Sequence, residues 1–117
     1  MIEYLKLKIN FVEGLKMKFY LGNAFSLQML SGDAVLIVEK VTPDQIPVTA
    51  ESVIGHEDTA RIVGSILGRE VKANRKSILL DDLTVLYVAQ YKGPRLPEGA
   101  TTLPEGATIE FLRVMLS

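Results

Sequence analysis

The sequence predicts a single α/β domain in which a mixed β-sheet is flanked by a few short helices. A chain of 117 residues is the usual size of one domain. Its 48% hydrophobic and 23% charged residues indicate a packed core rather than a disordered chain. Several stretches with apolar residues at every second position are typical of strands, and one stretch has helical spacing. We therefore treat residues 1–117 as one domain, with residues 1–16 as an extension.

The first half of the chain contains three predicted strands and one predicted helix. Apolar residues at every second position predict a half-buried strand over residues 3–11, and a second short strand follows over 17–21. Gly22 ends that strand, and residues 24–30 predict a short helix. The β-branched and apolar run 34–41 then predicts a strand that is buried on both faces.

Two helix starts are marked in the middle of the chain. Thr42 and Pro43 are residue types preferred at an N-cap and at the first helical position, so they predict a short turn or helix. Glu57 and Asp58 favour the first turn of a longer helix. Apolar residues recur there at helical spacing, and Gly68 supplies the expected left-handed C-terminal cap.

The second half of the chain ends in strands that are joined by a long loop. Strands are expected over residues 77–80, 84–90 and 108–116. In the loop over 91–107 the hexapeptide Leu-Pro-Glu-Gly-Ala-Thr occurs twice, at 96–101 and 103–108, which predicts a tandem pair of turns. A loop of this length in a compact domain usually has a function or is mobile.

Composition excludes several classes of chemistry. The absence of cysteine excludes disulfides, thiolate zinc sites and cysteine nucleophiles, and a single histidine excludes a paired-histidine metal site within one chain. The chain also has neither a phosphate-binding Gly-x4-Gly-Lys-Ser/Thr loop nor a dinucleotide-binding motif, and we expect no cofactor. A net charge of -1 argues against a general binder of long nucleic acids. Neither a signal peptide nor an apolar run of membrane-spanning length is evident, so we expect a cytoplasmic protein without a membrane partner.

The lone histidine stands where a helix is expected to begin. Gly55 would let a ligand approach the backbone closely, and the free N–H groups of the first turn after His56 favour an anion. Beside a phosphodiester, His56 could donate a proton to a leaving oxygen. The plainer alternative is a surface or capping histidine.

Other polar residues have a functional and a plainer interpretation as well. Arg95 could grip a phosphate and Glu98 could orient a hydroxyl, although composition alone favours a solvated pair. Arg75 could contact a phosphate from a turn. Further candidates are Asn23 and Ser26, which could instead cap a helix, and Gln90, which could be an ordinary polar residue at a strand end.

Four segments together carry a family resemblance. They are Tyr-Leu-Gly-Asn-Ala-Phe-Ser-Leu-Gln-Met-Leu at 20–30, Ile-Gly-His-Glu-Asp-Thr-Ala at 54–60, Asn-Arg at 74–75, and Leu-Tyr-Val-Ala-Gln at 86–90 followed by Arg-Leu-Pro-Glu-Gly at 95–99. In order and spacing, residues 17–117 resemble the viral anti-CRISPR ring nucleases. These are small dimeric proteins of archaeal viruses that also occur in bacteria.

The resemblance implies an enzyme that binds cyclic tetra-adenylate, the second messenger of type III CRISPR defence. It would cleave the ring without metal to linear di-adenylate, through attack by a ribose 2′-hydroxyl. His56 would be the general acid, Arg95 would grip the scissile phosphate and Glu98 would position the attacking group, in a loop that closes as a lid. Residues implied to bind the ring are Asn23, Ser26, Gln28, Gly55, Arg75 and Gln90.

The resemblance also implies a homodimer, in which two copies of His56 would face opposite bonds of the ring. Three features depart from the family pattern. Residues 1–16 precede the usual start near Met17, Gln28 replaces an expected Asn, and Asp58 would repel a phosphate unless it points away or caps the helix. The alternatives are a protein that binds the cyclic ligand without cutting it, as a sponge or sensor, and a sheet-based DNA-binding module.

Overall fold

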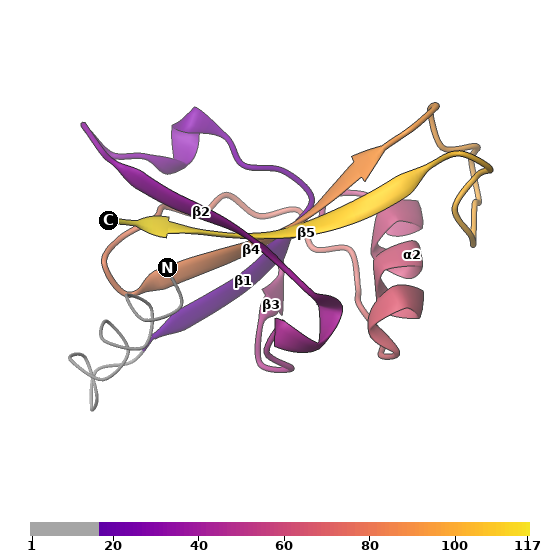
Figure 1. Ribbon diagram of the computed structural model, residues 1–117, viewed down its shortest axis with the longest axis horizontal. Coiled ribbons are helices and arrows are strands. Elements are labelled where there is room, and N and C mark those ends of the chain that lie inside the picture. The colour runs from indigo at the N-terminus through magenta and orange to yellow at the C-terminus, as the bar shows by residue number, and fades with distance from the viewer. Residues whose placement is uncertain (1–16) are drawn as a thin grey trace.

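A computed structural model describes residues 17–117, which form a five-stranded mixed sheet in the order β2-β5-β4-β1-β3 (Figure 1). The strands are β1 (Lys18–Gly22), β2 (Leu36–Val41), β3 (Glu51–Ser52), β4 (Thr84–Lys92) and β5 (Thr108–Leu116). β1 runs parallel to β3 and β4, whereas β5 runs antiparallel to β2 and β4. The predicted α/β class with a mixed sheet is confirmed. The strand expected over 3–11 lies outside the described residues.

One α-helix and two single 3₁₀ turns accompany the sheet. They are α2 (Glu57–Leu67), η1 (Leu27–Met29) and η2 (Pro43–Gln45). The predicted caps of the helical elements are confirmed: Thr42 is the N-cap of η2 with Pro43 in its first turn, and Gly68 caps α2 with φ 72°. Within residues 17–117, no helix is long and apolar enough to cross a membrane.

The sheet is covered on both sides, and β4 lies at its centre. On the face against which α2 packs, the helix face, Ala60 and Val63 contact a core that includes Val85 and Tyr87. On the opposite face, Leu86 and Val88 pack in a second core with side chains from 25–30 and 78–80. The first six residues of β4 are therefore buried, and its polar end at Gln90 emerges beyond both layers.

The short helix expected over residues 24–30 was wrong, because only η1 forms there. The Ser26 hydroxyl accepts a hydrogen bond from the backbone amide of Gln28 at 3.2 Å. Phe25, Met29 and Leu30 pack onto the opposite face of the sheet. A segment of this length does not offset the cost of nucleating an α-helix, so packing of its apolar side chains decides its shape.

The apolar strand in the run 34–41 exists, but its predicted burial on both faces was wrong. β2 covers Leu36–Val41 at the edge of the sheet, and Val38 is 54% exposed. An apolar run predicts a strand but does not say whether the strand lies at the centre or at an edge. β3 was missed altogether, because a strand of two residues leaves no alternation to detect.

The strand expected over 77–80 was also wrong, although its alternating burial was real. Ile78 and Leu80 are buried while Leu79 is 60% exposed. The Leu80 amide donates to the Met29 carbonyl at 2.8 Å, so the segment covers the opposite face of the sheet without joining a strand ladder. Alternation reports one buried face, and a covering segment produces it as readily as a strand.

The loop between β4 and β5 contains the predicted tandem turns. The Ala100 amide donates to the Pro97 carbonyl at 3.1 Å, and the Ala107 amide donates to the Pro104 carbonyl at 3.0 Å. Gly99 and Gly106 have φ values of 79° and 81° at the third position of each turn, as type II turns require. The loop extends past the end of the sheet beside α2 (Figure 1).

Candidate functional site

Three predicted residues line a single groove where the start of α2 meets the loop between β4 and β5. His56, Arg95 and Glu98 face this groove, which has a volume of about 840 Å³. We call it the histidine groove, and its remaining lining residues are Asp58, Thr59, Tyr91, Leu96 and Pro97. An imidazole, a guanidinium and a carboxylate thus lie around one hollow.

His56 is the N-cap residue of α2. Its backbone is extended, with φ −126° and ψ 131°, and its carbonyl accepts the first helical hydrogen bond from the Ala60 amide at 3.0 Å. Its imidazole makes no capping hydrogen bond and is exposed, so side-chain capping does not account for this histidine. The ring is free to meet a ligand in the groove.

The carboxylate of Asp58 forms hydrogen bonds within the protein. Its Oδ2 accepts a hydrogen bond from the Gly99 amide at 3.0 Å, and its Oδ1 accepts one from Nη1 of Arg61 at 3.2 Å. The same Nη1 donates to the Ala100 carbonyl at 3.3 Å. Both carboxylate oxygens are therefore engaged, and a guanidinium balances the charge that we expected to disfavour a phosphate.

A second, more apolar groove adjoins the first. It has a volume of about 540 Å³ and shares Thr59 and Tyr91 with the histidine groove. Asn23, at the end of β1, and Gln90, near the end of β4, supply polar groups at its wall. We call this the apolar groove, and its remaining lining residues are Ala24, Phe25, Leu36, Val38, Val88, Leu112 and Val114.

Arg75 lies beside the residue that precedes His56. A Cβ atom added to Gly55 would stand 3.6 Å from Cγ of Arg75, so the glycine lets the arginine stem pass close to the backbone. The chain at Arg75 is held there because the backbone amide of Asn74 donates to the Ile54 carbonyl at 2.8 Å. Arg75 itself is exposed.

Ser26 and Gln28 are not brought to either groove. The Ser26 hydroxyl caps η1, which is the plainer of its two predicted roles, and Gln28 is exposed on that turn. Thr59 and Tyr91, which link the two grooves, were missed by sequence reasoning. Tyr91 follows Gln90 in the alternating pattern of β4, which could have indicated a side chain on the other side of the strand.

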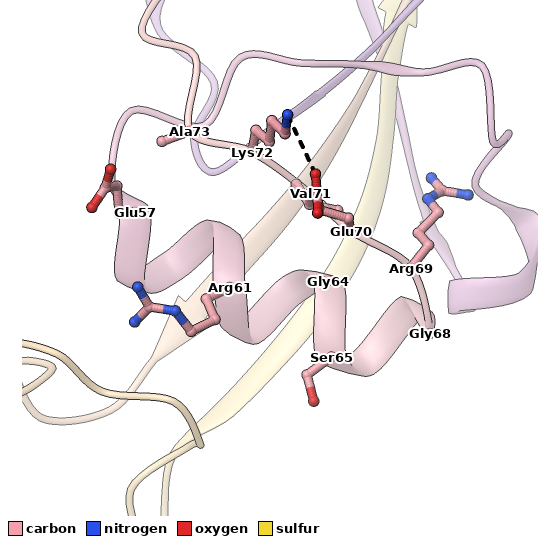
Figure 2. Close-up of a pocket in the computed structure, with 10 residues that line it drawn as sticks. All are labelled: Glu57, Arg61, Gly64, Ser65, Gly68, Arg69, Glu70, Val71, Lys72 and Ala73. Carbon is pink, nitrogen blue, oxygen red and sulfur yellow. Dashed lines mark ion pairs between the residues drawn. The ribbon is translucent and has the colours of Figure 1, made fainter.

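A further hollow of about 720 Å³ lies along the outer side of α2 and contains none of the predicted residues (Figure 2). Its charged groups are exposed except for Arg69, which is half-buried and donates to the Ile46 and Pro47 carbonyls. Lys72 pairs with Glu70 at 3.5 Å. It presents no buried polar group to a ligand. Within residues 17–117, no cluster of three or more histidine, aspartate or glutamate side chains is arranged to hold a metal ion.

Comparison with known proteins identifies the family. The sequence model of the STIV B116-like family matches residues 19–112, which run from β1 into β5. The chain belongs to the STIV B116-like family. Among solved structures it is similar to B116 of Sulfolobus turreted icosahedral virus, with a TM-score of 0.69 and 23% identity.

The match to B116 covers 84% of this chain and 98% of the viral chain, and at this identity it shows a shared fold. All lining residues of the histidine groove, and all of the apolar groove except Val114, lie within the part of the chain that matches the STIV B116-like family. No curated protein matches the sequence. The predicted likeness to small archaeal-virus proteins is thereby confirmed at the level of the family.

Proposed function

We propose that this protein is a metal-independent ring nuclease that binds cyclic tetra-adenylate and cleaves it to linear di-adenylate in the cytoplasm. Cleavage would end type III CRISPR signalling. The observation that carries the proposal is the meeting of His56, Arg95 and Glu98 in the histidine groove. Membership of the STIV B116-like family is consistent with it, since the sequence resemblance to ring nucleases extends over the same residues.

The chemistry needs little from the protein. A ribose 2′-hydroxyl of the ring attacks the adjacent phosphorus and loses its proton to solvent, and the bond from phosphorus to the 5′-oxygen breaks. His56 donates a proton to that leaving oxygen, and a cyclic phosphate remains on the product. Arg95 binds the phosphate and Glu98 orients the attacking ribose. Orientation, charge stabilisation and one proton donor are sufficient for such a reaction.

The apolar groove extends the site to the bases of the ligand. Adenine rings are flat and largely apolar, and Phe25 and Tyr91 lie at the wall of this groove. Asn23 and Gln90 supply hydrogen-bonding groups of the kind that bind base edges or ribose hydroxyls. The shared wall at Thr59 and Tyr91 supports a single ligand that spans both grooves.

We further propose that two copies form a homodimer around one ring. A two-fold axis would present two histidines to opposite bonds of a fourfold ligand. It would also double the number of arginines near four phosphates, although a single chain has a net charge of -1. Arg75 and Arg95 would supply these charges.

The test is a cleavage assay with cyclic tri-, tetra- and hexa-adenylate in the presence of EDTA. We expect cyclic tetra-adenylate to be converted to di-adenylate, and His56→Ala to slow cleavage by about 10²-fold or more, the usual contribution of general acid catalysis. Glu57→Ala, next to the histidine but outside the groove, is the matched control and should cleave at the normal rate.

Three other outcomes would change the proposal. Recovery of intact ring after incubation with excess protein would favour the alternative of a binding protein that acts as a sponge or sensor. Full cleavage by His56→Ala would remove the histidine as the general acid. Absence of any affinity for the ring would overturn both versions.

The proposed homodimer is tested by titrating His56→Ala with cyclic tetra-adenylate. We expect one ring to bind for each pair of chains.

A further inference from the structure

The first of the two tandem turns is hydrogen-bonded to α2, whereas the second makes no such bond within residues 17–117. The Gly99 amide and the Ala100 carbonyl of the first turn contact Asp58 and Arg61, at 3.0 and 3.3 Å respectively. Gly106 and Ala107 occupy the same positions in the second turn, with the same hexapeptide sequence and nearly the same φ. Among the described residues, no side chain bonds to the Gly106 amide in the way that Asp58 bonds to Gly99.

We propose that Asp58 and Arg61 form a latch that holds the turn at Gly99 against the start of α2. Glu98 directly precedes Gly99 and Arg95 stands four residues before it, so the latch places their side chains in the histidine groove. Figure 2 shows Arg61 projecting from α2 away from the Glu70–Lys72 pair. Asp58 and Arg61 are positioning residues, because they act on the groove through the loop.

The bonding pattern explains why the latch can hold an exposed loop. The carboxylate of Asp58 accepts from a backbone amide and from a guanidinium, and such charge-assisted hydrogen bonds are about twice as strong as neutral ones. Asp58 also lies in the first turn of α2, where the helix dipole favours a negative charge. The side chain of Arg61 bridges the carboxylate and the Ala100 carbonyl, so the contacts support one another.

The two hexapeptides provide an internal control for a proteolysis experiment. Glu98–Gly99 and Glu105–Gly106 are both exposed, and both have Leu-Pro before the glutamate and Gly-Ala-Thr after it. A protease that cleaves after glutamate should therefore discriminate between them through their structural context. Initial rates of cleavage at the two bonds can be followed by mass spectrometry of the intact, folded protein.

We expect Asp58→Ala to raise the ratio of cleavage at Glu98 to cleavage at Glu105 about tenfold, as the loss of charge-assisted bonds implies. Arg61→Ala should shift the ratio in the same direction by a smaller factor, because the bond from Gly99 to Asp58 remains. Glu57→Ala removes an exposed charge from the same helical turn and should leave the ratio unchanged.

Two outcomes of this experiment would overturn the latch. An unchanged ratio in Asp58→Ala would show that the contacts do not restrain the loop. An equal rise of both cleavage rates would show that the variant opens the whole domain rather than one turn. Neither result depends on what the protein binds.

The consequence for the ligand rests on the proposed function and is measured separately. In the His56→Ala background, the added Asp58→Ala change should speed dissociation of intact cyclic tetra-adenylate about tenfold, because the loop no longer holds Arg95 in place. If the ring dissociates at the normal rate although cleavage at Glu98 is faster, the latch restrains the loop but does not contribute to ring binding. Failure of the ring to bind at all would overturn the proposed function while the proteolysis result stands.

Discussion

At the residue scale, Asp81 organises the turn that leads into β4. Its Oδ1 accepts from the Thr84 hydroxyl at 2.7 Å and from the Leu83 amide at 2.9 Å, and Lys18 donates to its Oδ2 at 3.1 Å. The hydrogen bond from Thr84 is the main cause that lowers the pKa of Asp81 below its ordinary value of 3.8. Because the folded pKa is lowered, the ionised carboxylate stabilises the fold above pH 3.8, and this contribution is lost as pH falls through the folded pKa.

We expect Asp81→Asn to lower the free energy of unfolding at pH 7 by about 0.5–1 kcal/mol, since Asp81 is half exposed and solvent screens its charge. The difference from wild type should shrink as the pH falls below 3.8. Urea unfolding at several pH values measures both effects, with Asp82→Asn as the matched control in the same turn. A difference that stays constant into acid would contradict the assigned cause.

The single histidine shows how far reasoning from one residue can extend. Acidic residues at 57 and 58 predicted a helix start, and His56 is indeed the N-cap of α2. That signal is local, because a helix start is determined by a few consecutive residues. The contact of Asp58 with Gly99 was not predictable, since Gly99 lies 41 residues away and nothing in the local sequence identifies it.

At the element scale, α2 depends on a close approach at Gly64. A Cβ atom at this position would lie 2.6 Å from the Arg69 carbonyl oxygen and 3.1 Å from the Val71 amide nitrogen. The chain turns at Gly68 and runs back along the helix, so the glycine makes room for that backbone. A glycine within a helical pattern thus has a packing reason here, although it lowers helix propensity.

We expect Gly64→Ala to lower the free energy of unfolding by about 1–3 kcal/mol, because the steric cost exceeds the gain in helix propensity. Urea unfolding, monitored by far-UV circular dichroism, measures this change in the free energy of unfolding. Gly32→Ala is the control, since a Cβ there meets open space. If the two variants are equally stable, the close approach does not constrain the helix.

Elements whose signals are local were predicted well, and elements defined by their neighbours were not. α2, β4 and β5 form close to the bounds that the sequence predicts. The expected helix over 24–30 and the expected strand over 77–80 instead became layers that cover the sheet. Their apolar residues reported burial correctly, but burial alone does not choose between a ladder, a helix and an irregular covering segment.

At the scale of the whole molecule, a buried ion pair connects strands that are far apart in sequence. Arg113 of β5 stands opposite Glu39 of β2 and opposite Tyr87 of β4. Nη2 of Arg113 lies 3.4 Å from Oε2 of Glu39, with side chains 6% and 12% exposed. Nε of Arg113 and Oε1 of Glu39 are buried without a hydrogen-bond partner in the described structure. Burial of the neighbouring Tyr87 raises the pKa of its hydroxyl.

We expect Glu39→Gln to lower the free energy of unfolding by about 3 kcal/mol, because it leaves the Arg113 charge buried and unpaired. The double variant Glu39→Leu with Arg113→Met removes both charges and should be within about 1 kcal/mol of wild type, or more stable. Urea unfolding of the whole domain gives the free energies of unfolding of the wild type, the single variant and the double variant for comparison. A double variant as unstable as Glu39→Gln would show that the pair itself stabilises the sheet.

The sequence by itself determined the α/β class, the bounds of the main helix and of the last strand, and the chemical types at the candidate site. These follow from local periodicity, from capping residues and from the scarcity of histidine and cysteine. Only the tertiary structure decided which strands lie at the edge and that His56, Arg95 and Glu98 share one groove while Ser26 does not. It also paired Asp58 with Gly99. Such contacts join residues distant in sequence, and their partners are chosen by packing of the whole chain rather than by any local pattern.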